Sequence, residues 1–101
     1  AALETQELRV DGGAALNDWL MQFQADMLGI RLRRPKIVET TALGAAGLAG
    51  LATGVWSDAD DFLSVQGSGT QCEPRMPEPN RAALKTEWDR AVRAAIHWAG
   101  D

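Results

Sequence analysis

The sequence has 101 residues, of which 46% are apolar and 24% are charged, a composition typical of a folded globular chain and not of a disordered one. This length corresponds to one small domain or to part of a larger domain. Fourteen acidic residues against ten basic ones give a net charge of −4, which argues against nucleic acid or an anionic membrane surface as the main partner, because both attract basic surfaces.

The chain contains one cysteine, Cys72, and one histidine, His97. This excludes an intramolecular disulfide and a zinc site made of four Cys and His ligands. His97 has no serine or cysteine partner at a recognisable spacing, so we predict no catalytic residue and no metal site. The single cysteine and the lack of a secretory signal pattern favour the cytoplasm. The most apolar stretch, residues 41–56, is too short to favour a membrane span.

The first predicted elements are a strand, a turn and a helix. We expect residues 1–6 to form a frayed or helical end and Leu8–Val10 to form a short strand, followed by a turn over residues 11–13. Between Ala14 and Leu28 apolar residues recur at helical spacing. Gly29 then stands where a helix commonly has its C-cap glycine.

The middle of the chain is predicted to hold a second strand and a second helix. Ile30–Arg34 alternates apolar and basic residues, which favours a strand with one solvated face, and Pro35 marks a strand end or an edge position. We expect a further short extended piece at Val38–Glu39. Thr40 or Thr41 is a suitable N-cap for a helix that runs to Thr53 and ends at Gly54. The small residues of this helix favour close packing against a sheet.

The last third is predicted to form a polar turn or short helix, a loop and a long helix. Residues 56–62 form the polar turn or short helix, and residues 65–80, with three of the four prolines, form the extended loop. The final helix spans Glu78–Ala99. Its apolar stripe is Leu84, Trp88, Val92, Ala95 and Ala99.

Alternation of strands and helices predicts an α/β arrangement with parallel strands. Two or three strands are too few for a parallel sheet, which usually has more strands and both faces covered. We therefore expect the chain to be part of a larger sheet.

Two glycines stand at the junction between the first strand and the first helix. Ligands in open α/β sheets bind at the carboxyl ends of strands, and Gly12 and Gly13 allow a phosphate or ribose to approach the backbone. Asn17, one turn further on, can reach the edge of a base or a sugar. A tight turn with nothing bound explains the same pattern equally well.

Other polar clusters have two interpretations each. Asp11 is either a carboxylate near Mg²⁺ and phosphate or, in the interpretation we favour, a turn residue bonded to its own backbone. The acidic cluster at residues 58–61 is either a calcium site or, as we expect, a solvated helix start. The basic cluster at residues 31–34 is either an anion patch or the solvated face of an edge strand. We predict that the four tryptophans are core and interface anchors.

Three segments carry a family resemblance that covers nearly all of the chain from Glu7 onward. "ELRVDGGAALNDWLMQFQADMLGIRLRRP", "ETTALGAAGLAGLATGVW" and "EPRMPEPNRAALKTEWDRAVRAAIHW" resemble the C-terminal domain of the glycerol kinases, within the FGGY carbohydrate kinase family. The resemblance implies a partial ribonuclease H-like, actin-like ATPase fold with few parallel strands and about three helices. It also implies that residues 1–101 are the nucleotide-side segment of that domain.

The resemblance implies specific roles and a specific ligand. The family's nucleotide contacts correspond to Gly13, with Gly12 beside it, and to Asn17, and the implied ligand is ATP or ADP with Mg²⁺. Where the family often has a second asparagine this chain has Asp18. A usual aromatic is replaced by Gly47 and a usual phenylalanine by Cys72, which we expect to thin the packing.

The implied activity is transfer of the ATP γ-phosphoryl group to glycerol, but much of the machinery lies outside this segment. In this family the N-terminal domain supplies most of the glycerol site, and the catalytic aspartate lies upstream. We therefore expect the chain alone to be inactive, with adenine nucleotide as its partner and glycerol bound only in the complete enzyme. The alternative is a non-catalytic relic that acts as a self-associating or weak nucleotide-binding module. In this segment alone, strand edges and apolar helix faces are no longer covered by the rest of the parent domain. We therefore expect a homo-oligomer.

Overall fold

The computed structural model describes residues 4–100, which form a three-stranded sheet, four α-helices and one 3₁₀ helix. The predicted α/β class and its three longer helices are confirmed. Of the predicted N-terminal end, residues 4–6 have no regular structure, and the first three residues lie outside the described range. The elements are β1 (Glu7–Arg9), the 3₁₀ helix η1 (Gly13–Leu16), α1 (Asp18–Leu28), β2 (Arg31–Arg34), α2 (Thr40–Thr53), α3 (Ala59–Ser64), β3 (Thr70–Cys72) and α4 (Glu78–Trp98).

The sheet has the order β1-β2-β3, with β2 in the centre. The predicted parallel pairing holds for β1 and β2, but β3 runs antiparallel to β2. The loop predicted over residues 65–80 therefore contains a strand, and β2 is not an edge strand. Residues 38–39 form no strand. Antiparallel pairing lets one face of a sheet stay in water, which suits a sheet this small.

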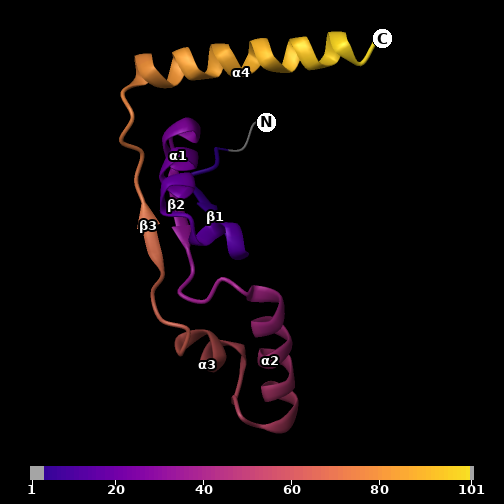
Figure 1. The fold of residues 1–101 in the computed structure, drawn as a ribbon. Helices are drawn as coiled ribbons and strands as arrows, with labels where there is room; N and C mark the ends of the chain where they lie inside the picture. Colours follow the sequence, from indigo (N-terminus) through magenta and orange to yellow (C-terminus); the bar gives the residue numbers. More distant parts are fainter. Residues whose placement is uncertain (1–3, 101) are drawn as a thin grey trace.

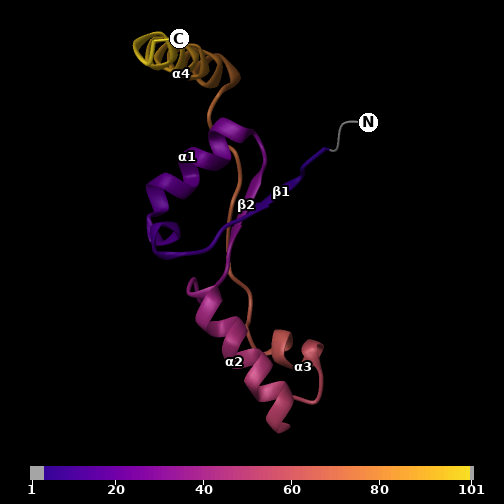
Figure 2. The same cartoon turned by 90° about the vertical axis from the view of Figure 1, so that its right-hand side faces the viewer.

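The two faces of the sheet differ in chemistry. The register places Leu8 beside Leu32, and Leu32 beside Cys72, in one apolar row. Helix α1 lies beside the sheet (Figure 2) and contributes Met21 and Ala25 to the core that contains Leu32. The buried apolar residues within 4–100 are Ala15, Met21, Ala25, Leu32 and Val38. The alternation in Ile30–Arg34 thus correctly predicted one buried and one solvated face.

Glycines end the first two long helices as predicted. Gly29 (φ 68°) and Gly54 (φ 83°) both adopt the left-handed conformation, and their N–H groups donate to Ala25 and Gly50. The N-terminal ends of α1 and α2 differ from the predicted ones. The helical pattern of Ala14–Leu28 is divided at Asn17 into η1 and α1. The N-cap position of α2 is occupied by Glu39, without a side-chain bond, so the prediction of a threonine cap is wrong.

The small residues of α2 pack against aromatic side chains and not against the sheet. An ideal Cβ on Gly47 would lie 2.7 Å from the ring of Phe62, and one on Gly50 would collide with Trp56. The two rings are themselves 5.4 Å apart. Phe62 therefore covers the position where the resembling family usually carries an aromatic side chain, and the expected thinning of the packing there is wrong.

The molecule is elongated. Its radius of gyration is 18.7 Å, against about 13 Å for a compact chain of this length. Helix α4 lies at one end and α2 with α3 at the other, with the sheet and α1 between them (Figure 1). None of the residues of α4, all of which are described, is buried, so the predicted stripe is exposed.

Most of the tryptophans are exposed to solvent as well. Trp19, Trp88 and Trp98 are 69%, 67% and 89% exposed, so none of these three anchors the core, and their predicted role at an interface stays a prediction. Trp56 is half-buried beside Gly50. Among residues 4–100, no helix combines the length and the apolar character needed to cross a membrane.

Candidate nucleotide site

The turn after β1 contains two glycines that serve different purposes. Gly12 has φ 89°, which favours glycine, and its N–H donates to the Val38 carbonyl over 2.8 Å. Gly13 is not in the left-handed region. Apart from the glycine itself, its chain neighbours and the backbone of its own helix, no atom of residues 4–100 lies within 4 Å of the place where a Cβ on Gly13 would stand. Backbone conformation therefore explains Gly12, whereas Gly13 leaves an exposed surface that a ligand can approach closely.

Asp11 connects this turn to the second helix. Its carboxylate accepts a hydrogen bond from the hydroxyl of Thr40, in the first turn of α2. The favoured interpretation, a bond to its own backbone, is replaced by this longer-range contact. Together with the bond from Gly12 to Val38, it holds the glycine turn against the segment that begins α2.

Asn17 caps a helix and still has polar capacity to spare. Its side-chain oxygen accepts a hydrogen bond from the Leu20 N–H over 3.0 Å, so the residue is the N-cap of α1 and the C-cap of η1. With the oxygen engaged, the exposed side-chain NH₂ group can donate to an acceptor on a ligand.

The three predicted nucleotide residues share one short element. Gly12 is the N-cap of η1, Gly13 is its first residue and Asn17 is its C-cap. A groove of about 670 Å³ lies nearby, at the carboxyl ends of β1 and β2 and the start of α2. Asp11 lines that groove, but the three predicted residues do not. The candidate site is therefore the open surface around η1, beside the groove.

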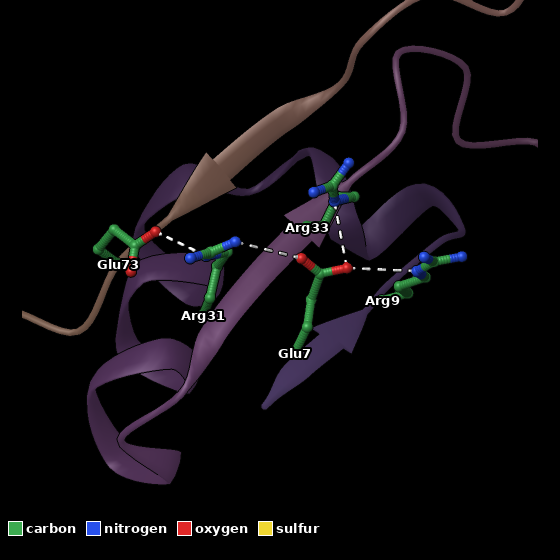
Figure 3. A network of polar contacts seen from close by, with 5 residues as sticks. All are labelled: Glu7, Arg9, Arg31, Arg33 and Glu73. Carbon is green, nitrogen blue, oxygen red and sulfur yellow. Dashed lines mark hydrogen bonds and ion pairs between the residues drawn. The ribbon is translucent and has the colours of Figure 1, made fainter. Parts of the chain in front are cut away.

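The basic residues of β2 are divided between the two sheet faces. On the polar face Glu7 contacts Arg9, Arg31 and Arg33 at 3.3, 3.8 and 3.2 Å, and Arg31 also pairs with Glu73 at 2.8 Å (Figure 3). Burial raises the pKa of the Glu7 carboxyl, but the hydrogen bonds and positive charges of Arg9 and Arg33 outweigh it and lower the pKa overall. Two carboxylates thus face three guanidinium groups, so most of the positive charge is compensated, which weakens the interpretation as an anion patch.

Arg34 lies on the other face, and sequence analysis did not distinguish it from its neighbours. Its side chain is only 16% exposed, and Nη1 donates to the Ala15 carbonyl over 2.8 Å and to the Asp18 carboxylate over 2.7 Å. The period of two in a strand gives the signal, because Arg34 shares the face of the buried Leu32.

The acidic cluster after α2 has a structural role. Asp58 is the N-cap of α3 and accepts a hydrogen bond from the Asp61 N–H over 2.7 Å, while Asp61 accepts from the Ser57 N–H. This confirms the expected solvated helix start. Within residues 4–100, no three Cys, His, Asp or Glu side chains stand close enough together to hold a metal ion.

The sequence matches a family model over residues 2–53, and this match includes β1, the glycine turn, η1, α1, β2 and α2. That model describes the C-terminal domain of the FGGY family of carbohydrate kinases. The chain belongs to this family. The predicted relationship is confirmed, and with it the actin-like ATPase fold class, of which this chain forms a part.

Individual relatives extend the match to the rest of the chain. The chain is 54% identical to a glycerol kinase of Dechloromonas aromatica over 98% of its length, and 50% identical to one of Deinococcus radiodurans over its full length. A crystal structure of Plasmodium falciparum glycerol kinase with ADP superposes with a TM-score of 0.67 at 34% identity and covers 88% of the chain. The chain spans about a fifth of the length of these relatives: 20% of each curated relative and 18% of the solved structure.

Proposed function

We propose that this chain supplies the adenine-nucleotide side of the active-site cleft in an ATP:glycerol phosphotransferase of the cytoplasm. The similar Plasmodium enzyme was solved with ADP, and here the nucleotide would lie on the surface around η1. Gly12 and Gly13 would admit its phosphate or ribose close to the backbone, and the NH₂ group of Asn17 would donate to the base or sugar.

One observation carries the proposal most directly. Gly13 is exposed, its φ does not require glycine, and the space above it is open. Nothing in the packing of residues 4–100 accounts for a glycine there, whereas close approach of a ligand does. Its place at the carboxyl end of a strand in an open α/β sheet is where ligands of such sheets bind.

The chain's contribution to phosphoryl transfer would be limited to positioning. Phosphoryl transfer requires groups placed around the phosphates and their Mg²⁺. The chain spans about a fifth of the length of its relatives, and the resemblance implies that most of the glycerol site and the catalytic aspartate lie outside this segment. We therefore expect no turnover of ATP with glycerol by the chain alone, as measured in a coupled assay after stringent purification.

Titration of the isotopically labelled chain with ADP tests the nucleotide role. A site with one side only is expected to be weak, with a Kd in the millimolar range, or about 4 kcal/mol of binding free energy. The amide signals of residues 11–18 should shift, whereas those of α4 should not. The absence of any shift at residues 11–18 at high ADP would contradict the proposal.

Two matched variants make the test specific. Gly13→Val places a branched side chain over the proposed surface, while Gly44→Val makes the same change on α2, where the space is also open. We expect Gly13→Val to abolish the shifts and Gly44→Val to leave them intact, with unchanged helix content in both. In the Dechloromonas relative, the change that corresponds to Gly13→Val should raise the KM for ATP, and the change that corresponds to Gly44→Val should not.

A second candidate function rests on the exposed apolar side chains. The core is small, and α4 presents Leu84, Trp88 and Ile96 to solvent. A non-catalytic module that associates with another copy of itself would cover these side chains. Association that ADP does not affect, together with no ADP shifts, would favour this second candidate.

A further inference from the structure

Arg34 makes two contacts that bracket the residue proposed to bind nucleotide. From the end of β2 its guanidinium donates to the carbonyl of Ala15, which belongs to η1, and to the carboxylate of Asp18, which begins α1. Asn17 stands between these two contacts, at the break between the helices. One side chain thus ties both sides of the break to the central strand of the sheet.

We infer that Arg34 is a positioning residue for the nucleotide site, acting through Ala15 and Asp18 to hold Asn17 and the η1 surface in their binding geometry. The inference rests on the proposed function for the role of Asn17, but the contacts of Arg34 are independent of it. A guanidinium suits the task because it is planar, always charged and carries several donors in a fixed arrangement.

The environment of Arg34 supports a precise role. The side chain is largely shielded from water, and Ala15, whose carbonyl it binds, is buried. The bond to Ala15 is therefore charge-assisted and partly buried, and a charge-assisted hydrogen bond is stronger than a neutral one. The Asp18 carboxylate, by contrast, is 86% exposed. Arg31 is half-exposed on the opposite face, where it pairs with Glu7 and Glu73.

Asp18 supplies the negative charge that pairs with the Arg34 guanidinium. At the position where the resembling family often has asparagine, the carboxylate pairs with Arg34 over 2.7 Å. Asparagine could accept the same hydrogen bond but would not neutralise the guanidinium. We therefore expect Asp18→Asn to weaken ADP binding less than the loss of Arg34, because the bond to Ala15 and one acceptor remain.

ADP titration of the full chain tests the inference with Arg34→Met and the matched control Arg31→Met. Both variants remove one positive charge from β2 and keep an unbranched side chain. We expect Arg34→Met to weaken ADP binding at least tenfold and to speed amide exchange at residues 17–20, with the signals of α2 and α4 unchanged. Arg31→Met should bind ADP within twofold of the original chain.

The conservative variant and the exchange data separate the possible outcomes. Arg34→Lys keeps the charge but lacks the planar set of donors, so it should restore only part of the affinity. ADP affinity within twofold for Arg34→Met, or an equal loss for Arg31→Met, would overturn the inference. If the original chain itself binds no ADP, the proposed function fails. The positioning role is then judged by amide exchange at residues 17–20, and unchanged exchange in Arg34→Met would overturn it too.

Discussion

At the scale of single residues, Asn17 combines a structural and a ligand-binding role, and substitutions can separate the two. Its oxygen caps α1, while its NH₂ group is available to a ligand. Serine retains an oxygen acceptor at an N-cap but has no NH₂ group.

We expect Asn17→Ser to keep the free energy of unfolding within a few tenths of a kcal/mol and to weaken ADP binding. Asn17→Ala should lose ADP binding and also about 1 kcal/mol of stability, because the cap is removed. Urea denaturation and ADP titration on the same samples measure both quantities. Equal ADP binding by the serine variant and the original chain would show that the NH₂ group makes no contact.

Sequence patterns predicted the location of the candidate site but not how it is held. Strand, double glycine and helical period are local features, and all three appear in the structure near their predicted places. The break at Asn17 was not predicted, although asparagine is a favoured N-cap residue, because the helical spacing of apolar residues continues across it. The contact between Thr40 and Asp11 joins residues 29 positions apart, and it engages one of the two threonine hydroxyls that were candidates for capping α2.

At the scale of elements, the glycines of α2 occupy two different environments. Outside its own helix backbone and chain neighbours, no atom of residues 4–100 lies within 4 Å of a Cβ on Gly44, whereas one on Gly47 would lie 2.7 Å from the ring of Phe62. The same substitution should therefore have opposite effects at positions that lie one turn apart on the same helix.

We expect Gly44→Ala to raise the free energy of unfolding by about 0.5–1 kcal/mol, because alanine restricts the unfolded chain and favours a helix. Gly47→Ala should lower it by about 1–3 kcal/mol, because the methyl group displaces a packed ring. Thermal or urea denaturation monitored by circular dichroism gives both values. If both changes stabilise, Phe62 does not pack on α2 as described.

Asp26 links α1 to the segment that leads into α4. Its carboxylate accepts hydrogen bonds from the backbone N–H groups of Arg75 at 2.8 Å and Met76 at 3.3 Å, and from the Gln22 side chain at 2.9 Å. The bond from the Arg75 backbone is the largest cause that lowers the pKa of Asp26; burial opposes it, and the bonds from Gln22 and Met76 lower the pKa further.

Because the pKa of Asp26 is lower in the folded chain than in the unfolded one, the unfolded chain binds more protons in this range. The stabilising contribution of the Asp26 carboxylate is therefore complete above the ordinary aspartate pKa of about 3.9 and is lost as the pH falls through the lowered pKa. We expect Asp26→Asn to lower the free energy of unfolding at pH 7. The difference in unfolding free energy between this variant and the original chain should become smaller toward pH 3. Urea denaturation at several pH values measures it, and a difference independent of pH would contradict the assignment.

Element boundaries show which long-range features the sequence could not reveal. The ends of α1 and α2 were predictable because helical periodicity stops at a glycine that adopts the left-handed conformation. Strand β3 was not predictable, because it lies among glycines and prolines and pairs with residues far away in the chain. The apolar stripe of α4 was visible in the sequence, but a stripe does not identify what covers it.

At the scale of the whole molecule, an elongated shape and a small core leave apolar surface uncovered. The outer strands have only three residues each, so a strand added at either edge would gain few hydrogen bonds. Helix α4 offers far more surface, since it is 21 residues long and none of its residues is buried. Association through α4 is therefore favoured over strand addition.

We expect the chain to sediment as a dimer or larger oligomer at micromolar concentration, above its monomer mass of 10.9 kDa. Trp88→Lys should shift the equilibrium toward the monomer, whereas the control Thr86→Lys, on the same helix, should not. Sedimentation equilibrium decides the point. A monomer that melts cooperatively would show that the apolar surface of α4 drives no association.

The intrinsic fluorescence of the exposed tryptophans can report whether a partner covers them. Three of its four indole rings stand in water at separate places, one on α1 and two on α4, while Trp56 is sheltered near the far end. Their fluorescence should therefore be red-shifted and readily quenched by acrylamide in the free chain. Any partner that covers α4, whether a second copy or a longer polypeptide, would shift the emission to the blue without any label being attached.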